Sequence, residues 1–223
     1  MNPAIHQTSG ARAVAPAVSN KVIRNTYALL SMTLLFSALC TGVSMALKLP
    51  HPGLLMTLGG YFGLLFLTTR FRNSALGLVC VFALTGFMGY TLGPIISHYL
   101  AAQNGGQIVI HAMAATGGIF LGLSGYVLVT GKDFSFLGGL VMTGILVAFL
   151  AGIGAVLFDV PALSLAVSSI FVLLMGGLIL YQTSALVHGG ETNYILATVT
   201  LYVSIFNLFT SLLHLLGIMG GDE

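Results

Sequence analysis

The stretch HGGETNYILATVTLYVSIFNLFTSLLHLLG, residues 188–217, is apolar over a length that can cross a bilayer, yet small and polar side chains recur along it every three or four residues. At about 100° per residue, these side chains share one face of a helix. Hydrocarbon cannot solvate such a face, because a buried amide without a partner is costly. The pattern therefore predicts a membrane helix inside a bundle, whose polar face meets protein or a water-filled cavity. This face comprises Asn193, Ala197, Thr200, Ser204, Asn207, Ser211 and His214.

The composition of the 223-residue chain indicates an integral membrane protein. Hydrophobic residues make up 57% and charged residues only 5%, whereas a soluble domain carries about 25% charged residues. The net charge of +2 comes from a few scattered groups, so the chain offers no basic stripe that could bind nucleic acid. No motif for a cofactor or a metal ion is found, and we expect neither.

Seven apolar stretches predict seven transmembrane helices, because each is close to the ~20 residues that a span requires. Their connections are short, which makes neighbouring helices antiparallel and leaves no room for a soluble domain. We expect an all-α membrane domain over residues 21–219, a disordered cytoplasmic tail over 1–20 and a short periplasmic tail over 220–223. The expected spans are about 26–47, 53–69, 75–97, 107–130, 135–158, 162–187 and 193–217.

The positions of lysine and arginine predict the orientation in the membrane. If the N-terminus is cytoplasmic, six of the 7 basic residues lie inside and only Lys48 lies outside, as the positive-inside rule favours. The C-terminus is then periplasmic. Residues 1–20 have no apolar core, so no secretory signal is visible and the first span is expected to remain as an anchor. The six inner residues are Arg12, Lys21, Arg24, Arg70, Arg72 and Lys132.

Small residues within the spans predict packing rather than chemistry. Cys40 and Cys80 both fall within spans, where a free cysteine is usually a small buried hydrophobe. Glycines four residues apart allow two helices to approach closely. Three such pairs predict close helix contacts: Gly59 and Gly63, Gly89 and Gly93, and Gly118 and Gly122.

The tetrapeptide GLSG at residues 122–125 matches the GxSG motif of rhomboid intramembrane proteases, which use a histidine from a later helix. Here Ser124 lies ~9 Å above the inner end of its helix. His188 lies at the inner edge and His214 near the outer one, so neither is at a matching depth. The second span also offers no histidine or asparagine for an oxyanion hole. We therefore predict no catalytic residues and interpret this motif as a packing site.

Four histidines share the outer face under this orientation. A metal site or a pH-responsive cluster could form there. However, the sequence contains no HxxxH or HExxH pair, and histidines tolerate the membrane interface, so separate interfacial positions are the preferred interpretation. The four are His51, His98, His111 and His214.

The polar groups of the last two spans form the candidate site. Thr200, Ser204 and Ser211 can bond back to carbonyls one turn earlier, but the amides of Gln182 and Asn207 cannot satisfy all their groups in this way. Two interpretations remain open, namely hydrogen bonds between helices and a polar cavity or conduction route. Such a route would use Gln182, Ser204, Asn207, Thr200 and Ser211, with Arg70 near its inner mouth.

Four stretches, in order along the chain, resemble the Bax inhibitor-1 family, and the match covers nearly all residues after 20. They are TLGPIISHYL (91–100), KDFSFLGG (132–139), LILYQTSALVHGGETNY (178–194) and LYVSIFNLFTSLLHLLG (201–217). The HGGETNY and LYVSIFNLF forms are most similar to the bacterial inner-membrane branch that binds and modulates FtsH, a membrane-anchored ATP-dependent protease. The resemblance implies a seven-helix bundle whose last helix is enclosed by the other six. It also implies a membrane regulator of protein degradation whose partners are FtsH and the lipid bilayer.

The chain departs from those family members that are proposed to be pH-sensitive calcium leaks. They carry an Asp after the Tyr of the sixth-span motif, another in the LYxD of the last span, and an Arg ending the second span. Here these positions hold Gln182, Ser204 and either Arg70 or Arg72. Two carboxylates sharing a site can sense pH, whereas an amide and a hydroxyl do not titrate near neutrality. A calcium or proton leak therefore remains the alternative function, without the pH-sensing mechanism.

Overall fold

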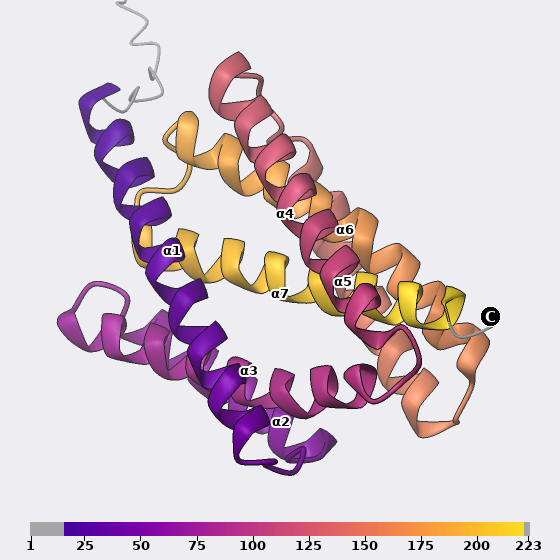
Figure 1. The fold of residues 1–223 in the computed structure, drawn as a ribbon. Helices are drawn as coiled ribbons and strands as arrows, with labels where there is room; N and C mark the ends of the chain where they lie inside the picture. The colour runs from indigo at the N-terminus through magenta and orange to yellow at the C-terminus, as the bar shows by residue number, and fades with distance from the viewer. Residues whose placement is uncertain (1–15, 221–223) are drawn as a thin grey trace, which may run out of the picture.

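The computed structural model describes residues 16–220, with side chains from residue 20 onward, and in this range it consists of seven α-helices (Figure 1). The all-helical class predicted from the sequence is confirmed. The helices are α1 (Pro16–Ala46), α2 (Leu54–Arg70), α3 (Ala75–Leu100), α4 (Gly105–Thr130), α5 (Leu137–Leu157), α6 (Pro161–Val187) and α7 (Tyr194–Met219).

The first helix begins earlier than the sequence suggested. Residues 16–20, which we assigned to a disordered tail, belong to α1, whereas residues 1–15 and 221–223 lie outside the described part of the chain. Proline is tolerated in the first turn of a helix, so Pro16 does not oppose this start. Lys21 and Arg24 are exposed, and long basic side chains allow a helix to continue beyond the apolar core of a membrane.

Six helices in the described chain, all except α2, are long and apolar enough to cross a membrane. The 17 residues of α2 are also apolar, but they span only about 25 Å at 1.5 Å per residue, which is less than the ~30 Å of a bilayer core. The seven spans expected from the sequence therefore depend on α2. This helix can cross only if its ends lie in the headgroup layer or the bilayer thins around it.

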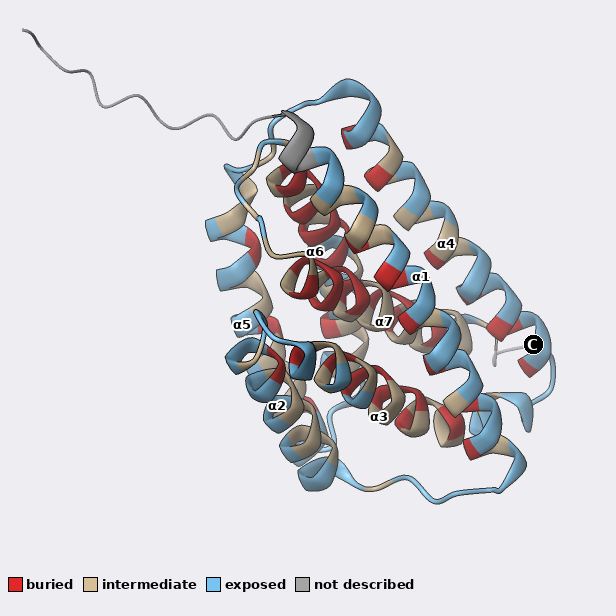
Figure 2. Ribbon diagram, turned by 90° about the vertical axis from the view of Figure 1, so that its left-hand side faces the viewer, coloured by how far each residue is buried: buried red, intermediate tan, exposed pale blue. Residues whose placement is uncertain are grey.

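The last helix is the most enclosed part of the described chain. More than half of its apolar membrane-spanning stretch is buried, a larger share than in any other candidate span. No residue from Tyr194 to Gly217 is exposed. Figure 2 shows the buried residues gathered along α7 and the helices facing it. Helix α7 contacts α1, α2, α3, α4 and α6, but no Cα atom of α5 lies within 8 Å of one in α7. The family resemblance implied six neighbours, and the structure has five, because α5 packs on α6 instead.

Close packing between α1 and α3 depends on one of the three glycine pairs. A Cβ atom on Gly89 would lie 2.4 Å from the backbone oxygen of Ser37, and one on Gly93 would lie 2.5 Å from Ser44 Oγ. These two positions therefore require glycine, as expected. A Cβ on any member of the other two pairs would meet no atom within 4 Å, so the close contacts predicted there are wrong. A spacing of four residues places two glycines on the same face of a helix, but it does not show whether another helix packs against that face.

Candidate functional site

The polar side chains of α7 bond mainly to their own helix. Ser204 Oγ donates to the Thr200 carbonyl oxygen over 2.8 Å, and Asn207 Nδ2 donates to the Val203 carbonyl oxygen over 2.8 Å. Such bonds satisfy a donor without a second helix. For Asn207 this bond uses one of the two amide hydrogens, so the expectation that its own helix cannot satisfy every group of this side chain stays a prediction. Ser211, further along α7, is buried.

Gln182 is a buried amide whose nitrogen has no partner. Its side chain is 6% exposed and its Nε2 makes no hydrogen bond, a state shared in the described chain only by Thr26 Oγ1. A contact of 2.7 Å between Ser168 Oγ and His214 Nδ1 fixes the antiparallel register of α6 and α7. Gln182 follows Ser168 by 14 residues in α6, and Thr200 precedes His214 by 14 residues in α7. Because both helices rise equally per residue, Gln182 and Thr200 lie equally far along their helices from this contact.

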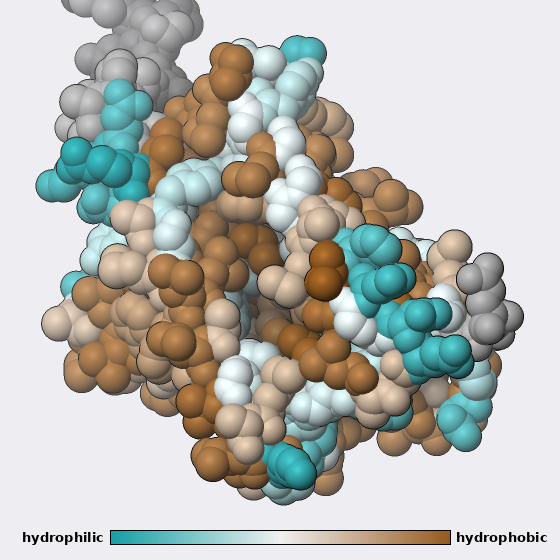
Figure 3. Space-filling model, viewed as in Figure 1, coloured by the Kyte–Doolittle hydropathy of each residue, from teal (hydrophilic) through white to brown (hydrophobic). Residues whose placement is uncertain are grey.

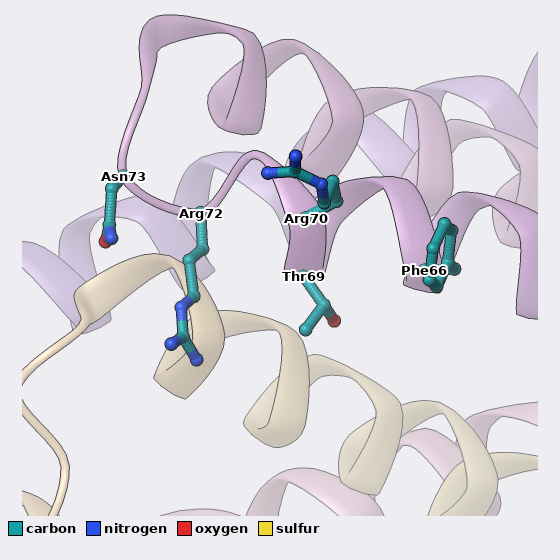
Figure 4. Close-up of a pocket in the computed structure, with 5 residues that line it drawn as sticks. All are labelled: Phe66, Thr69, Arg70, Arg72 and Asn73. Carbon is teal, nitrogen blue, oxygen red and sulfur yellow. The ribbon is translucent and has the colours of Figure 1, made fainter.

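Arg70 lies apart from this interior. It is exposed at the end of α2, where it lines a surface pocket with Arg72 and Asn73 of the following loop (Figure 4). In the described chain, no hydrogen bond joins the side chains of any two of the six residues expected to form a polar route. The structure therefore distributes these residues between the interior and the surface and does not bring them together as one site.

A buried tyrosine of α7 makes side-chain hydrogen bonds to two neighbouring helices, the kind of contact that we had considered for the amides. The hydroxyl of Tyr202 lies 2.6 Å from Ser37 Oγ of α1 and donates to the Thr85 carbonyl oxygen of α3 over 3.2 Å. Tyr202 is 1% exposed. A tyrosine hydroxyl in mid-membrane needs such partners, because hydrocarbon offers none. The position of Tyr202 in the middle of a span was the sequence signal that we missed.

The serine of the GLSG motif belongs to a second hydroxyl cluster. Ser124 Oγ of α4 hydrogen-bonds to the hydroxyl of Tyr27 in α1 and lies 3.3 Å from Thr183 Oγ1 in α6. It is buried and its partners are hydroxyls, not a histidine. The side chain therefore links three helices, which agrees with the packing interpretation of this motif.

The four outer histidines have separate surroundings. His214 contacts a serine of α6, His51 Nδ1 accepts a hydrogen bond from the Gly53 amide, and His98 and His111 are exposed. In residues 16–220, no three histidine, cysteine or acidic side chains are grouped so that they could hold a metal ion. The cluster considered from the sequence is therefore not formed.

A groove opens between α1 and α4, and its lining residues all belong to helices that are long and apolar enough to cross a membrane. Its volume is about 450 Å³ and its floor is α7, while α1 and α4 have no Cα atoms within 8 Å of each other. Figure 3 shows it as a hollow lined mainly by hydrophobic surface. Its hydroxyls are satisfied within the bundle: Ser37 pairs with Tyr202, Thr41 donates to the Ser37 carbonyl, and Thr116 donates to the Ala112 carbonyl. The groove therefore suits an apolar occupant.

Hydrogen bonds join the loops at the end of the bundle where α2 ends and α7 begins. Asn193 caps α7, because its Oδ1 accepts from the amides of Ile195 over 3.0 Å and Leu196 over 3.1 Å. Its Nδ2 donates to the Arg72 carbonyl oxygen over 3.1 Å and to Asn73 Oδ1 over 2.7 Å. The α6–α7 connection is therefore attached to the α2–α3 connection. The first polar residue of the α7 stripe is a cap and a loop contact, not part of the interior.

Asp133 attaches the α4–α5 loop to α6 at the same end. Its Oδ1 accepts from the Ser135 amide over 2.8 Å and from Ser184 Oγ over 3.3 Å. Ser184 Oγ in turn accepts from the Phe134 amide over 2.8 Å. Donation from the Ser135 amide is the largest cause that lowers the pKa of Asp133, with smaller contributions from the hydroxyls of Ser135 and Ser184 and from the charge of His188.

We expect Asp133→Asn to destabilise the protein at neutral pH and not at low pH. The lowered pKa means that the carboxylate stabilises the fold above the pKa of an unfolded aspartate, about 4, and that this contribution is lost as the pH falls through the folded value. Because the group is fully exposed, the melting temperature at pH 7 should fall by no more than about 2 °C. Thermal unfolding in detergent at pH 7 and pH 3 measures this, and an equal decrease at both pH values would contradict it.

Comparison with known proteins identifies the family. The family model described as inhibitor of apoptosis-promoting Bax1 matches residues 19–221, nearly the whole chain. The chain belongs to the Bax inhibitor-1 family. An uncharacterized protein of Pseudomonas aeruginosa is 53% identical to it over 91% of each chain. An Escherichia coli protein named modulator of FtsH protease YccA is 50% identical over 92% of this chain and 93% of its own. An uncharacterized membrane protein of Vibrio cholerae is 42% identical over 92% of each chain.

Membership of the Bax inhibitor-1 family bears out the resemblance drawn from four sequence motifs. Two of these motifs contribute directly to the loops at the end of the bundle where α7 begins: KDFSFLGG supplies the Asp133 turn, and HGGETNY supplies the Asn193 cap. These family motifs therefore hold loops together.

Proposed function

We propose that this protein is a regulator of the bacterial inner membrane that binds FtsH and modulates the degradation of membrane proteins. The observation that carries the proposal is the 50% identity, over 92% of the chain, to the E. coli protein named modulator of FtsH protease. The matching sequence from a second E. coli strain is named an inner membrane protein. A regulatory role also agrees with a bundle whose candidate polar residues do not form one site.

The proposed topology has seven spans, with α7 inside the bundle, the N-terminus in the cytoplasm and the C-terminus in the periplasm. In this orientation the basic side chains near the start of α1, at the end of α2 and just after α4 all face the cytoplasm, and Lys48 faces the periplasm. The hydrogen bonds from Asn193 to the α2–α3 loop support a common side for these two connections. Termini on opposite sides of the membrane require an odd number of crossings. The crossing by α2 brings the number from six to seven.

The groove between α1 and α4 is our proposed contact surface for a transmembrane segment of FtsH. Such a segment is an apolar helix, and the groove presents apolar side chains with no unsatisfied hydroxyl. Small residues on both walls, among them Ala38 and Gly42 of α1 and Gly117 of α4, leave room for a close approach. In a bilayer, helices associate by packing. A groove of about 450 Å³ therefore favours an occupant that can pack against its walls, such as a protein helix or a lipid.

We expect the full-length protein to co-purify with FtsH in mild detergent and to slow the degradation of a membrane substrate severalfold in reconstituted proteoliposomes. The substrate level is followed over time with and without the protein, and a soluble FtsH substrate serves as the control. A general inhibitor would protect both substrates, whereas the proposed regulator protects the membrane substrate more. Absence of both binding and protection would refute the proposal.

A calcium or proton leak is the alternative, and the observation on its side is the unpartnered Nε2 of Gln182 in the interior. A conduction path also needs polar groups that face the ion. The hydroxyl hydrogen of Ser204 and one amide hydrogen of Asn207 are donated to their own helix, and no acidic residue lies within the described helices. Divalent cations prefer carboxylate and carbonyl oxygens, so the regulatory role is the better supported.

A further inference from the structure

A pocket of about 440 Å³ at the inner end of α2 lies outside the groove and the polar interior. It is lined by two apolar or weakly polar residues of α2, by Arg70, and by Arg72 and Asn73 of the α2–α3 loop. Figure 4 shows the five residues around the end of α2, with Arg70 and Arg72 extending to different sides. The other two residues are Phe66 and Thr69.

The acidic side chains of this end of the bundle are used elsewhere. Asp133 Oδ1 accepts hydrogen bonds from Ser135 and Ser184, and Glu191 Oε1 accepts one from the Asn193 amide over 2.7 Å. Each carboxylate therefore satisfies backbone or hydroxyl donors of its own loop. The positive charge of the two arginines in the pocket is left for a partner from outside the described chain.

The orientation of two amides adds a donor to the pocket. The cap on α7 requires Asn193 to turn its oxygen towards the helix, so its nitrogen faces the α2–α3 loop. Asn193 Nδ2 donates a hydrogen bond to Asn73 Oδ1 over 2.7 Å. The Nδ2 of Asn73 is then the end of that side chain that can donate to a ligand. The hydroxyl of Thr69 donates back to Leu65. The pocket therefore offers guanidinium and amide donors on a loop held by hydrogen bonds, which is the chemistry that binds a phosphate.

Phe66 indicates that the phosphate is part of an amphiphile. This side chain is 69% exposed and lies one turn before Arg70, on the same face of a short apolar helix. A ligand whose phosphate meets the arginines would therefore place its next atoms along an aromatic surface at membrane depth. A phospholipid matches both parts, whereas an acidic peptide or free phosphate would leave Phe66 without a role. Arginine pockets at the cytoplasmic ends of spans suit anionic headgroups.

We propose that this pocket binds the headgroup of an anionic phospholipid of the inner leaflet. Arg70 and Arg72 would approach its phosphate from two sides of the end of α2, with Asn73 as a further donor and an acyl chain along Phe66. Asn193 acts as a positioning residue, because it orients Asn73 without lining the pocket. The binding is independent of any contact with FtsH in the groove.

The test uses the full-length protein in detergent, with phosphatidylglycerol as the probe and phosphatidylcholine of the same chains for comparison. Native mass spectrometry counts retained lipids, and thermal shifts give apparent affinities. We expect Arg70→Gln with Arg72→Gln to weaken phosphatidylglycerol binding about tenfold and to leave phosphatidylcholine unchanged. The matched control is Lys21→Gln with Arg24→Gln, which removes two exposed charges at the same end of the bundle and should keep the affinity.

Asn193→Ser tests the positioning role. Serine can still cap α7, but it cannot hold the oxygen of Asn73, so binding should weaken severalfold while the melting temperature without lipid changes little. Three outcomes would overturn the proposal: equal weakening by both charge pairs, an equal thermal shift with inorganic phosphate, or displacement of the lipid by a poly-glutamate peptide at lower concentration. The second would identify a free anion site, and the third would identify a protein partner.

Discussion

Gly89→Leu is expected to prevent the accumulation of folded protein. A Cβ at this position would lie 2.4 Å from the backbone oxygen of Ser37, and a backbone atom of a packed helix cannot give way as a side chain can. The added side chain would separate α3 from α1 and break the bond between Thr41 Oγ1 and the Gly89 carbonyl oxygen. Overpacking of this kind costs about 3 kcal/mol or more, a large part of the stability of an ordinary domain.

The control is Gly118→Leu, because a Cβ at Gly118 would meet no atom within 4 Å. Both variants make the same chemical change in a membrane helix. Fluorescence-detected size-exclusion chromatography of a fusion protein compares their folded yields in detergent. If both variants elute as the native protein in similar amounts, the close contact between α1 and α3 is not required.

Filling the groove with Gly42→Leu and Gly117→Leu is expected to abolish most of the effect on FtsH. Both glycines line the groove, and a Cβ at either position would meet no atom within 4 Å, so the leucines can occupy the groove without disturbing the bundle. A helix that packs there would lose its contact with α7. We expect FtsH to be retained at least about tenfold more weakly, which corresponds to about 1.4 kcal/mol, and the membrane substrate to be degraded nearly as fast as without the protein.

The matched double variant is Gly118→Leu with Gly122→Leu. These glycines lie on α4 beside the groove, but they do not line it, and a Cβ at either meets open space. Thermal unfolding establishes that both double variants are folded before FtsH retention is compared. Equal retention by the two variants would place the FtsH contact elsewhere on the surface.

The sequence predicted the helices and the burial of α7 because both follow from periodicity. Apolar length defined the spans, and the stripe from Asn193 to His214 required that this face avoid lipid. The interior assignment agrees with the absence of exposed residues between Tyr194 and Gly217. The start of α1 was missed, because the polar residues before Lys21 carry no periodic signal of their own.

The sequence did not predict the arrangement of the candidate site. A polar stripe shows which face of a helix avoids lipid, but it does not show which groups that face contacts. Ser204 and Asn207 use the carbonyls of α7 itself, and a one-dimensional pattern cannot distinguish such a bond from one to another helix. Tyr202 carries the contacts to α1 and α3, but a single aromatic in an apolar run looks like ordinary packing. The groove could not be predicted either. It exists because α1 and α4 do not contact each other, and no sequence pattern reveals a missing contact.

The enclosure of α7 also has a consequence for how the protein is made. Translation runs from the N-terminus, so the helix that contacts five others leaves the ribosome after the other six described helices. Until it arrives, α1 and α4 have no α7 floor between them, and Leu84 of α3 and Leu30 of α1 lack part of the core in which the structure buries them. A ribosome that stalls before residue 194 would therefore leave the first six helices without the helix that forms the groove floor and contributes several residues to the core.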